Sequence, residues 1–198
     1  MKQRLPEPVK LHEDVTKCPA CGKNSLHLVV YLYEVPMVGP VTMTVGKCGE
    51  CGFSFRDVRL AEAKPPRRIV LEVQDPEDLD ILVVRAPSAT VRIEGLVEEG
   101  PLEMKPGPVA DGFITTVEGI LHRFKEVIDF LCEEPDVDKA KCEKVQKAVK
   151  EAIGGKRRFK LVIEDPEGVS AVASNKARIE PLENRGEQEG EEKMIEQR

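Results

Sequence analysis

The chain has 198 residues, of which 40% are hydrophobic and 33% are charged, and its formal net charge is −6. This length suits one ordinary domain or two small ones. A net negative charge argues against a broad nucleic-acid-binding surface, which must neutralise phosphates. No apolar run approaches the roughly 20 residues of a membrane-spanning helix, so no membrane association is expected. The N-terminal sequence lacks the apolar core of a secretory signal, so we expect a cytoplasmic protein.

The N-terminal third of the chain predicts a small β-rich module. Residues 1–15 are polar and contain proline, and we expect them to be a lead-in. Residues 16–62 hold two cysteine pairs with strand-like runs at 26–33, 41–45 and 53–58. Pro65 and Pro66 predict a linker, since two consecutive prolines interrupt both helix and strand.

Residues 67–181 predict a β domain that is interrupted by a helical hairpin over 116–153. Short β-branched runs bounded by turn residues indicate strands near 69–73, 81–84, 89–93, 159–163 and 169–173. Apolar residues from Val117 to Leu131 recur at three- and four-residue spacing, which predicts a core-packed helix that Thr115 and Glu118 would cap. A second helix is expected from about Asp136 to residue 153. Residues 182–198 are polar and acidic, and we expect a disordered tail.

The strongest motif is a pair of Cys-x-x-Cys-Gly sequences formed by Cys18, Cys21, Cys48 and Cys51. Two residues between cysteines let a tight turn direct both sulfurs at one ion, and two such turns supply the tetrahedral thiolate set of structural zinc. In the cytosol such pairs are more often metal ligands than disulfides. A thioredoxin-type redox pair would need a βαβ context that is absent here. The motif therefore predicts one structural Zn²⁺ ion.

The remaining two cysteines lie at the junction of the predicted helices. Cys132 and Cys142 are expected to be buried free thiols, because their offset along the hairpin makes a disulfide awkward. His27 lies between the two cysteine pairs. Its position in an alternating strand predicts an ordinary side chain and not a ligand.

Several motifs resemble the ZPR-type zinc-finger family, in order over about residues 17–173. They are Glu34-Val35-Pro36 with Gly39, Gly46-Lys47-Cys48, the segments 88–93 and 115–119, and Glu164-Asp165-Pro166-Glu167-Gly168. The resemblance is to the single-copy archaeal form. It implies a zinc ribbon followed by a double-stranded β-helix domain with an inserted helical hairpin. It also implies binding of translation elongation factor one-alpha, for which eukaryotic members act as a folding chaperone.

The fold class expected is therefore mainly β with an α-helical hairpin. The leading functional hypothesis is a protein-interaction module, an adaptor or chaperone for the elongation factor one-alpha GTPase. The alternative is a nucleic-acid-binding zinc ribbon of the transcription or translation machinery. No enzyme is expected, because the sequence shows no catalytic triad pattern, phosphate-binding loop or dinucleotide fingerprint. Candidate partner-binding residues, each of which could instead simply shape a turn, are Glu34, Val35, Pro36, Gly39, Asp165 and Gly168.

Overall fold

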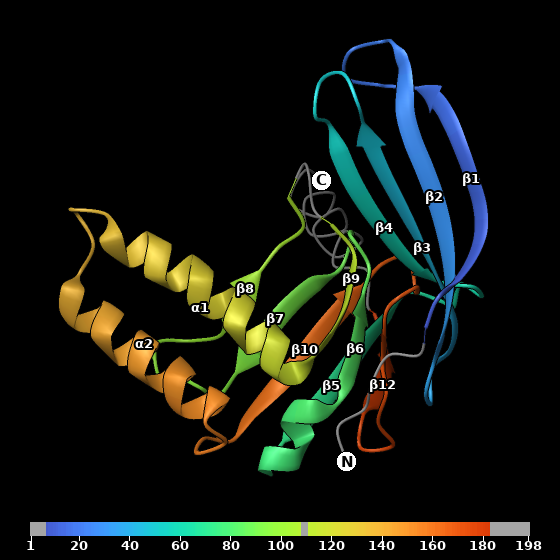
Figure 1. Cartoon of the computed structure of the whole chain (residues 1–198). Coiled ribbons are helices and arrows are strands. Elements are labelled where there is room, and N and C mark those ends of the chain that lie inside the picture. The colour runs from blue at the N-terminus through green and yellow to red at the C-terminus, as the bar shows by residue number, and fades with distance from the viewer. Residues whose placement is uncertain (1–6, 108–110, 183–198) are drawn as a thin grey trace, which may run out of the picture.

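The computed structural model describes residues 7–107 and 111–182. These residues form two arms that diverge from a shared base (Figure 1). One arm is a four-stranded sheet, the other is a helical hairpin, and two further sheets lie between them. This arrangement confirms the mainly β fold class with one helical hairpin.

The first arm is an antiparallel sheet in the order β1-β2-β3-β4, which we call the ribbon. Its strands are β1 (Val9–Lys17), β2 (Asn24–Val35), β3 (Gly39–Cys48) and β4 (Ser54–Leu60). The expectation of a lead-in over residues 1–15 is wrong from residue 9 onward, because β1 pairs with β2. β1 is a polar, exposed edge strand, so its backbone pairing leaves little trace in the hydrophobic pattern.

The β domain consists of two antiparallel sheets around one apolar core. A short 3₁₀ helix (Pro76–Asp80) precedes β6. The strands of the three-stranded sheet are, in order, β11 (Ala171–Val172), β6 (Leu82–Arg85) and β9 (Phe113–Thr116). The strands of the five-stranded sheet are, in order, β12 (Arg178–Pro181), β5 (Arg67–Val73), β10 (Phe159–Asp165), β7 (Thr90–Glu94) and β8 (Leu102–Met104).

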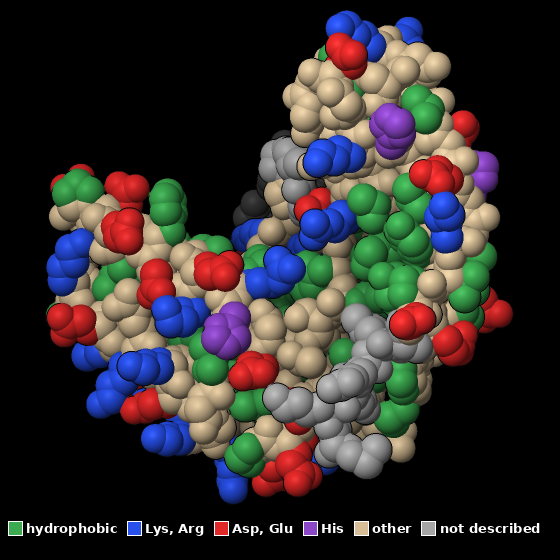
Figure 2. Space-filling view, in the orientation of Figure 1, with side chains coloured by type: hydrophobic (Ala, Val, Ile, Leu, Met, Phe, Trp, Pro, Cys, Tyr) green, Lys and Arg blue, Asp and Glu red, His purple; other side chains and the backbone are tan. Residues whose placement is uncertain are grey.

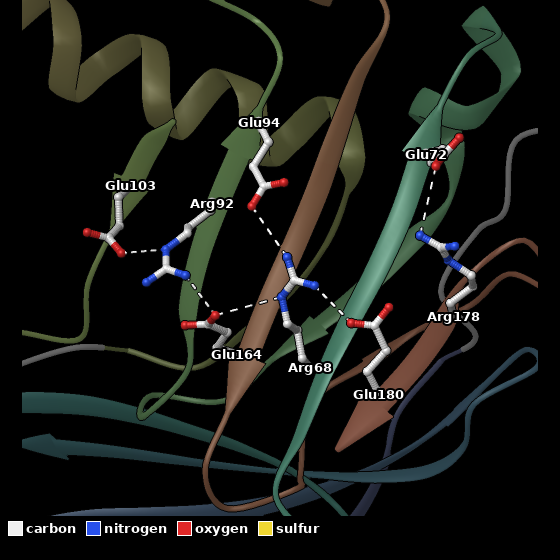
Figure 3. A network of polar contacts seen from close by, with 8 residues as sticks. All are labelled: Arg68, Glu72, Arg92, Glu94, Glu103, Glu164, Arg178 and Glu180. Carbon is white, nitrogen blue, oxygen red and sulfur yellow. Dashed lines mark hydrogen bonds and ion pairs between the residues drawn. The ribbon is translucent and has the colours of Figure 1, made fainter. Parts of the chain in front are cut away.

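The outer face of the five-stranded sheet carries a network of ion pairs that joins all five strands (Figure 3). Arg92 on β7 bridges Glu103 at 2.6 Å and Glu164 at 2.7 Å. Arg68 on β5 continues the network to Glu180 at 2.8 Å. Networked, partly buried pairs hold their geometry better than isolated surface pairs. We therefore infer that this network has a structural role and holds neighbouring strands of the sheet together.

The second arm consists of α1 (Val117–Glu133) and α2 (Lys139–Ile153). The cap of α1 is Thr116, whose hydroxyl accepts a hydrogen bond from Gly119 N at 3.1 Å, and not the expected Thr115. The expected start of α2 near Asp136 was early, because Asp138 caps this helix by accepting from two backbone amides. Neither described helix is long and apolar enough to cross a membrane.

Only the first half of the apolar stripe on α1 packs in the core. Ile120, Leu121 and Phe124 are buried, whereas Val127 and Leu131 are about half exposed. The prediction of core packing from Val117 to Leu131 is therefore wrong for the second half. The reason is geometric, since the hairpin extends past the edge of the sheets that cover its base (Figure 1).

A disulfide joins Cys132 to Cys142, which contradicts the expectation of two free thiols. Cys132 lies in the last turn of α1 and Cys142 in the first turn of α2, and their Cα atoms are 5.8 Å apart. Cys132 and Cys142 were expected to be offset along the hairpin because the predicted start of α2 lay too early in the sequence. With Asp138 as the cap, the two turns face each other across the short connection.

The ribbon and the β domain share a second apolar cluster, which we call the junction. It contains Val35, Val41 and Val58 from the ribbon and Leu82, Val84 and Ala173 from the β domain. Backbone hydrogen bonds reinforce it, including Leu60 N to Val169 O at 3.1 Å and Gly112 N to Arg56 O at 3.1 Å. Burial of these side chains holds the base of the ribbon against the three-stranded sheet.

Candidate metal centre and ribbon surface

The two cysteine pairs lie in the turns that join β1 to β2 and β3 to β4, at the end of the ribbon farthest from the β domain (Figure 1). The turns have matching geometry, since Gly22 and Gly52 both have a φ of 75°. Glycine adopts this left-handed conformation at little cost, which lets the chain fold back beside the sulfurs. Backbone bonds close each turn, with Cys18 N to Lys23 O at 2.7 Å and Cys48 N to Phe53 O at 2.8 Å.

The four sulfur atoms converge on one point. All lie within 4.8 Å of one another, with Cys18 Sγ to Cys51 Sγ at 3.7 Å and Cys21 Sγ to Cys48 Sγ at 3.8 Å. A tetrahedral zinc ion with metal–sulfur bonds of about 2.3 Å places its sulfurs about 3.8 Å apart. The donor set is therefore positioned to hold a metal ion, and four thiolates of this spacing suit the chemistry of zinc.

The surroundings of Cys48 favour its thiolate form, whereas the pKa of Cys51 is raised to about 12, because a backbone hydrogen bond with Phe53 is outweighed by burial and by the other three cysteine sulfurs. A hydrogen bond with the Ser25 hydroxyl, 3.1 Å from Cys48 Sγ, and bonds from the backbone amides of Cys51 and Glu50 lower the pKa of Cys48 to about 6. Cys18 and Cys48 are buried beside Leu26. Because a thiolate and not a thiol ligates metals, the lowered pKa prepares Cys48 for binding near neutral pH, while Cys51 must release its proton when a metal binds.

The candidate partner-binding residues lie at the opposite end of the ribbon. The β2–β3 turn carries Glu34, Val35, Pro36 and Gly39, and it approaches the β domain through the hydrogen bond from Ala61 N to Pro40 O at 2.9 Å. Glu34 and Pro36 are exposed, but Val35 is only 1% exposed and belongs to the junction. The sequence suggested that Val35 contacts a partner, but the Val35 side chain packs inside the junction instead.

The other candidate turn, at Asp165 and Gly168, also belongs to the junction. The Asp165 side chain is fully buried and accepts hydrogen bonds from the backbone amides of Glu167 and Ser170. Gly168 O accepts from Lys64 N at 3.0 Å and from the Arg67 guanidinium at 3.2 Å. Both turns thus flank the segment that links the ribbon to the β domain. Asp165 shapes this turn from inside, and a role of the turn in binding a partner stays a prediction.

One face of the ribbon presents apolar side chains that the sequence reasoning did not single out. Cross-strand neighbours Val29 and Val45, and Tyr31 and Met43, lie on the face that continues into the buried junction. All four are only partly buried. Figure 2 shows hydrophobic side chains gathered on the lower half of the ribbon, close to its base. The sequence did contain a signal for this face. Every second residue of a strand lies on the same face, so the residues that alternate with Val35 along β2 and with Val41 along β3 share the face of the junction.

Comparison with known proteins identifies the family. The family model described as the ZPR1 jelly-roll domain matches residues 77–193, more than half of the chain. A ZPR1-like protein of Pyrococcus horikoshii is 33% identical over 89% of this chain and 80% of its own length. A ZPR1-like protein of Methanocaldococcus jannaschii is 34% identical over 78% of each chain.

Eukaryotic relatives match over a smaller part of their length. The zinc finger chaperone zpr1 of Schizosaccharomyces pombe is 26% identical over 81% of this chain but only 35% of its own length. The match to a jelly-roll model agrees with two antiparallel sheets around one core, and the expected resemblance is confirmed. The chain belongs to the ZPR1 family.

Proposed function

We propose that this chain binds one zinc ion and acts in the cytoplasm as an adaptor or chaperone for the translation elongation factor one-alpha GTPase. The observation that carries the proposal is the convergence of four cysteine sulfurs at tetrahedral spacing in a member of the ZPR1 family. One relative in that family is named a zinc finger chaperone. Elongation factor one-alpha is proposed as the partner because the resemblance of the sequence motifs to this family implies it.

A structural role for the metal follows from the ligand set. A catalytic zinc ion keeps one position open for water or substrate, whereas four protein sulfurs fill a tetrahedron. The proposed zinc would hold the two turns at the end of the ribbon and so fix the register of its four strands. We propose a binding module and not an enzyme on this basis.

The proposed contact surface is the partly buried apolar face of the ribbon around Val29, Tyr31, Met43 and Val45. These side chains remain partly accessible to solvent, and contiguous accessible apolar surface typically marks an interaction site. A chaperone needs such a surface, because its client exposes apolar side chains until folding is complete.

Binding of the purified chain to purified elongation factor one-alpha, measured by biolayer interferometry, tests the proposal. Val45→Asp places a charge on the apolar face and should weaken binding at least tenfold. Thr44→Asp is the matched control, because Thr44 is the neighbouring residue and projects from the opposite face of β3. It should leave binding within about twofold. Elemental analysis should find one zinc per chain.

Two results would count against the proposal. One is an absence of any detectable complex at low ionic strength with zinc-loaded protein. The other is an equal loss in both variants, which would show that the apolar face is not the contact surface.

A further inference from the structure

The positive charge of this acidic chain is concentrated in one segment. Residues 139–160 carry nine Lys and Arg against two Glu, a local net charge of +7 in a chain whose formal net charge is −6. The segment comprises α2 and the connection that leads into β10. The molecule is therefore strongly polarised, and its overall charge conceals a basic surface.

The structure arranges this charge as a row along α2. Lys144, Lys147 and Lys150 are exposed and lie along the side of α2 that faces away from the core, whereas Lys141 is exposed in the first turn of the helix. The opposite side of the helix is buried at residues 148, 149 and 152. Beyond the helix the exposed side chains of Lys156, Arg158 and Lys160 extend the basic surface, which we call the basic row. Figure 2 shows Lys and Arg side chains gathered over the hairpin arm.

Little of this charge is neutralised within the chain. Glu151 pairs with Arg157 at 2.6 Å, but across the described residues Lys144, Lys150 and Arg158 form no side-chain hydrogen bond or ion pair. Glu98 and Glu99 border one side of the row, where they line a groove of about 660 Å³ with Lys144 and Lys147. Repeated like charges on one helix are destabilising. A bound polyanion would offset that cost.

The chemistry of the row favours a phosphate backbone. Its members are mostly lysines, which bind phosphates as flexible point charges. Residues 139–158 contain no aromatic side chain that could stack on the bases of a single strand. The one amide of α2, Gln146, is bonded to Asp129 at 2.9 Å. The row therefore lacks a free amide side chain of the kind that reads adenine.

We propose that the basic row binds the phosphate backbone of a nucleic-acid duplex, either RNA or DNA, without sequence preference. Duplex RNA has a deep, narrow major groove and is recognised mainly by shape and by phosphate and sugar contacts across its shallow face. A helix of 15 residues, about 22 Å long, lies along such a surface with its lysines toward successive phosphates. This surface is separate from the ribbon face proposed for the GTPase.

Fluorescence anisotropy of a labelled 20-base-pair RNA duplex with the full chain tests the proposal. The charge reversal Lys144→Glu with Lys147→Glu should weaken binding at least tenfold. The control is Lys47→Glu with Arg56→Glu, which makes the same charge change at exposed positions of the ribbon. It should change the affinity by no more than about threefold. Circular dichroism and zinc content check that both variants are folded.

Salt dependence gives a second, independent readout. With four phosphate contacts, the slope of log affinity against log salt should be about −3.5, and the α2 variant should reduce its magnitude by nearly 2. An absence of binding at 50 mM salt, or an equal loss in both variants, would overturn the proposal. A DNA duplex of the same sequence, measured in the same way, shows which of the two duplexes binds more tightly. If poly-glutamate displaces the labelled duplex as well as unlabelled RNA does, the basic row binds acidic proteins and the proposal is wrong.

Discussion

Gly168 provides the sharpest test of how the ribbon is joined to the β domain. Its φ is 67°, and a Cβ atom built on it would lie 1.8 Å from Lys64 O and 2.5 Å from Lys64 C. These are backbone atoms of the linking segment, which cannot move aside as a flexible side chain can. The substitution Gly168→Ala must therefore push the linking segment away from the turn.

The cost can be worked out from the contacts that would separate. A left-handed conformation costs a residue with a Cβ about 1 kcal/mol. Separation would also break the bonds from Lys64 N to Gly168 O and from Leu60 N to Val169 O, at about 1 kcal/mol each. We expect Gly168→Ala to lower the free energy of unfolding by about 3 to 4 kcal/mol.

Gly95 offers a matched control. Its φ is 77°, and a Cβ there would meet nothing within 4 Å. Gly95→Ala should therefore cost only the backbone strain, about 1 kcal/mol. Urea unfolding of zinc-loaded protein, followed by circular dichroism, gives both values. Equal losses in the two variants would refute the argument, because they would show that the approach of Lys64 to the turn carries no energetic weight.

Three further predictions follow from the described contacts. Removal of zinc by a chelator, or Cys21→Ser with Cys51→Ser, should cost the ribbon on the order of 10 kcal/mol and expose it to proteolysis, while the helical circular dichroism signal persists. Reduction of the Cys132–Cys142 disulfide, which spans 10 residues, should destabilise the hairpin by about 3 kcal/mol, measurable as a lower urea midpoint; an unchanged midpoint would contradict it. Burial opposes ionisation of Asp78, but hydrogen bonds from Lys176 and from the amides of Gln74 and Asp75 hold its pKa below the usual value. Asp78 therefore stabilises the fold above about pH 4 and loses that effect as the pH falls through its lowered pKa. Asp78→Asn should cost about 2 kcal/mol at pH 7 and less at pH 2.5, as measured by thermal unfolding at both values.

Features with a short-range cause were predictable from the sequence. The spacing within the two cysteine pairs predicted a metal site because tight turns and glycines determine where the sulfurs point. The periodicity from Val117 to Phe124 predicted a buried helical face. β1 was missed because an exposed edge strand is defined by pairing with β2 and not by an apolar pattern of its own.

Features that depend on distant neighbours were not predictable. Val35 reads as part of a turn motif, and only the three-dimensional structure shows that it packs beside Leu82 and Val84. The disulfide was missed because an error of about three residues in the start of α2 displaces Cys142 by nearly one helical turn. The basic row was hidden in the net charge, although the composition of residues 139–160 alone would have shown it.

The position of the metal centre has a consequence for both proposed surfaces. The cysteine turns lie at the end of the ribbon farthest from the junction, so loss of zinc removes the support of the apolar face at one end only. The basic row lies on the other arm, where α2 packs against α1 and the β-domain core. Zinc removal should therefore abolish binding of the GTPase while RNA binding persists, so the two activities can be separated in a single preparation.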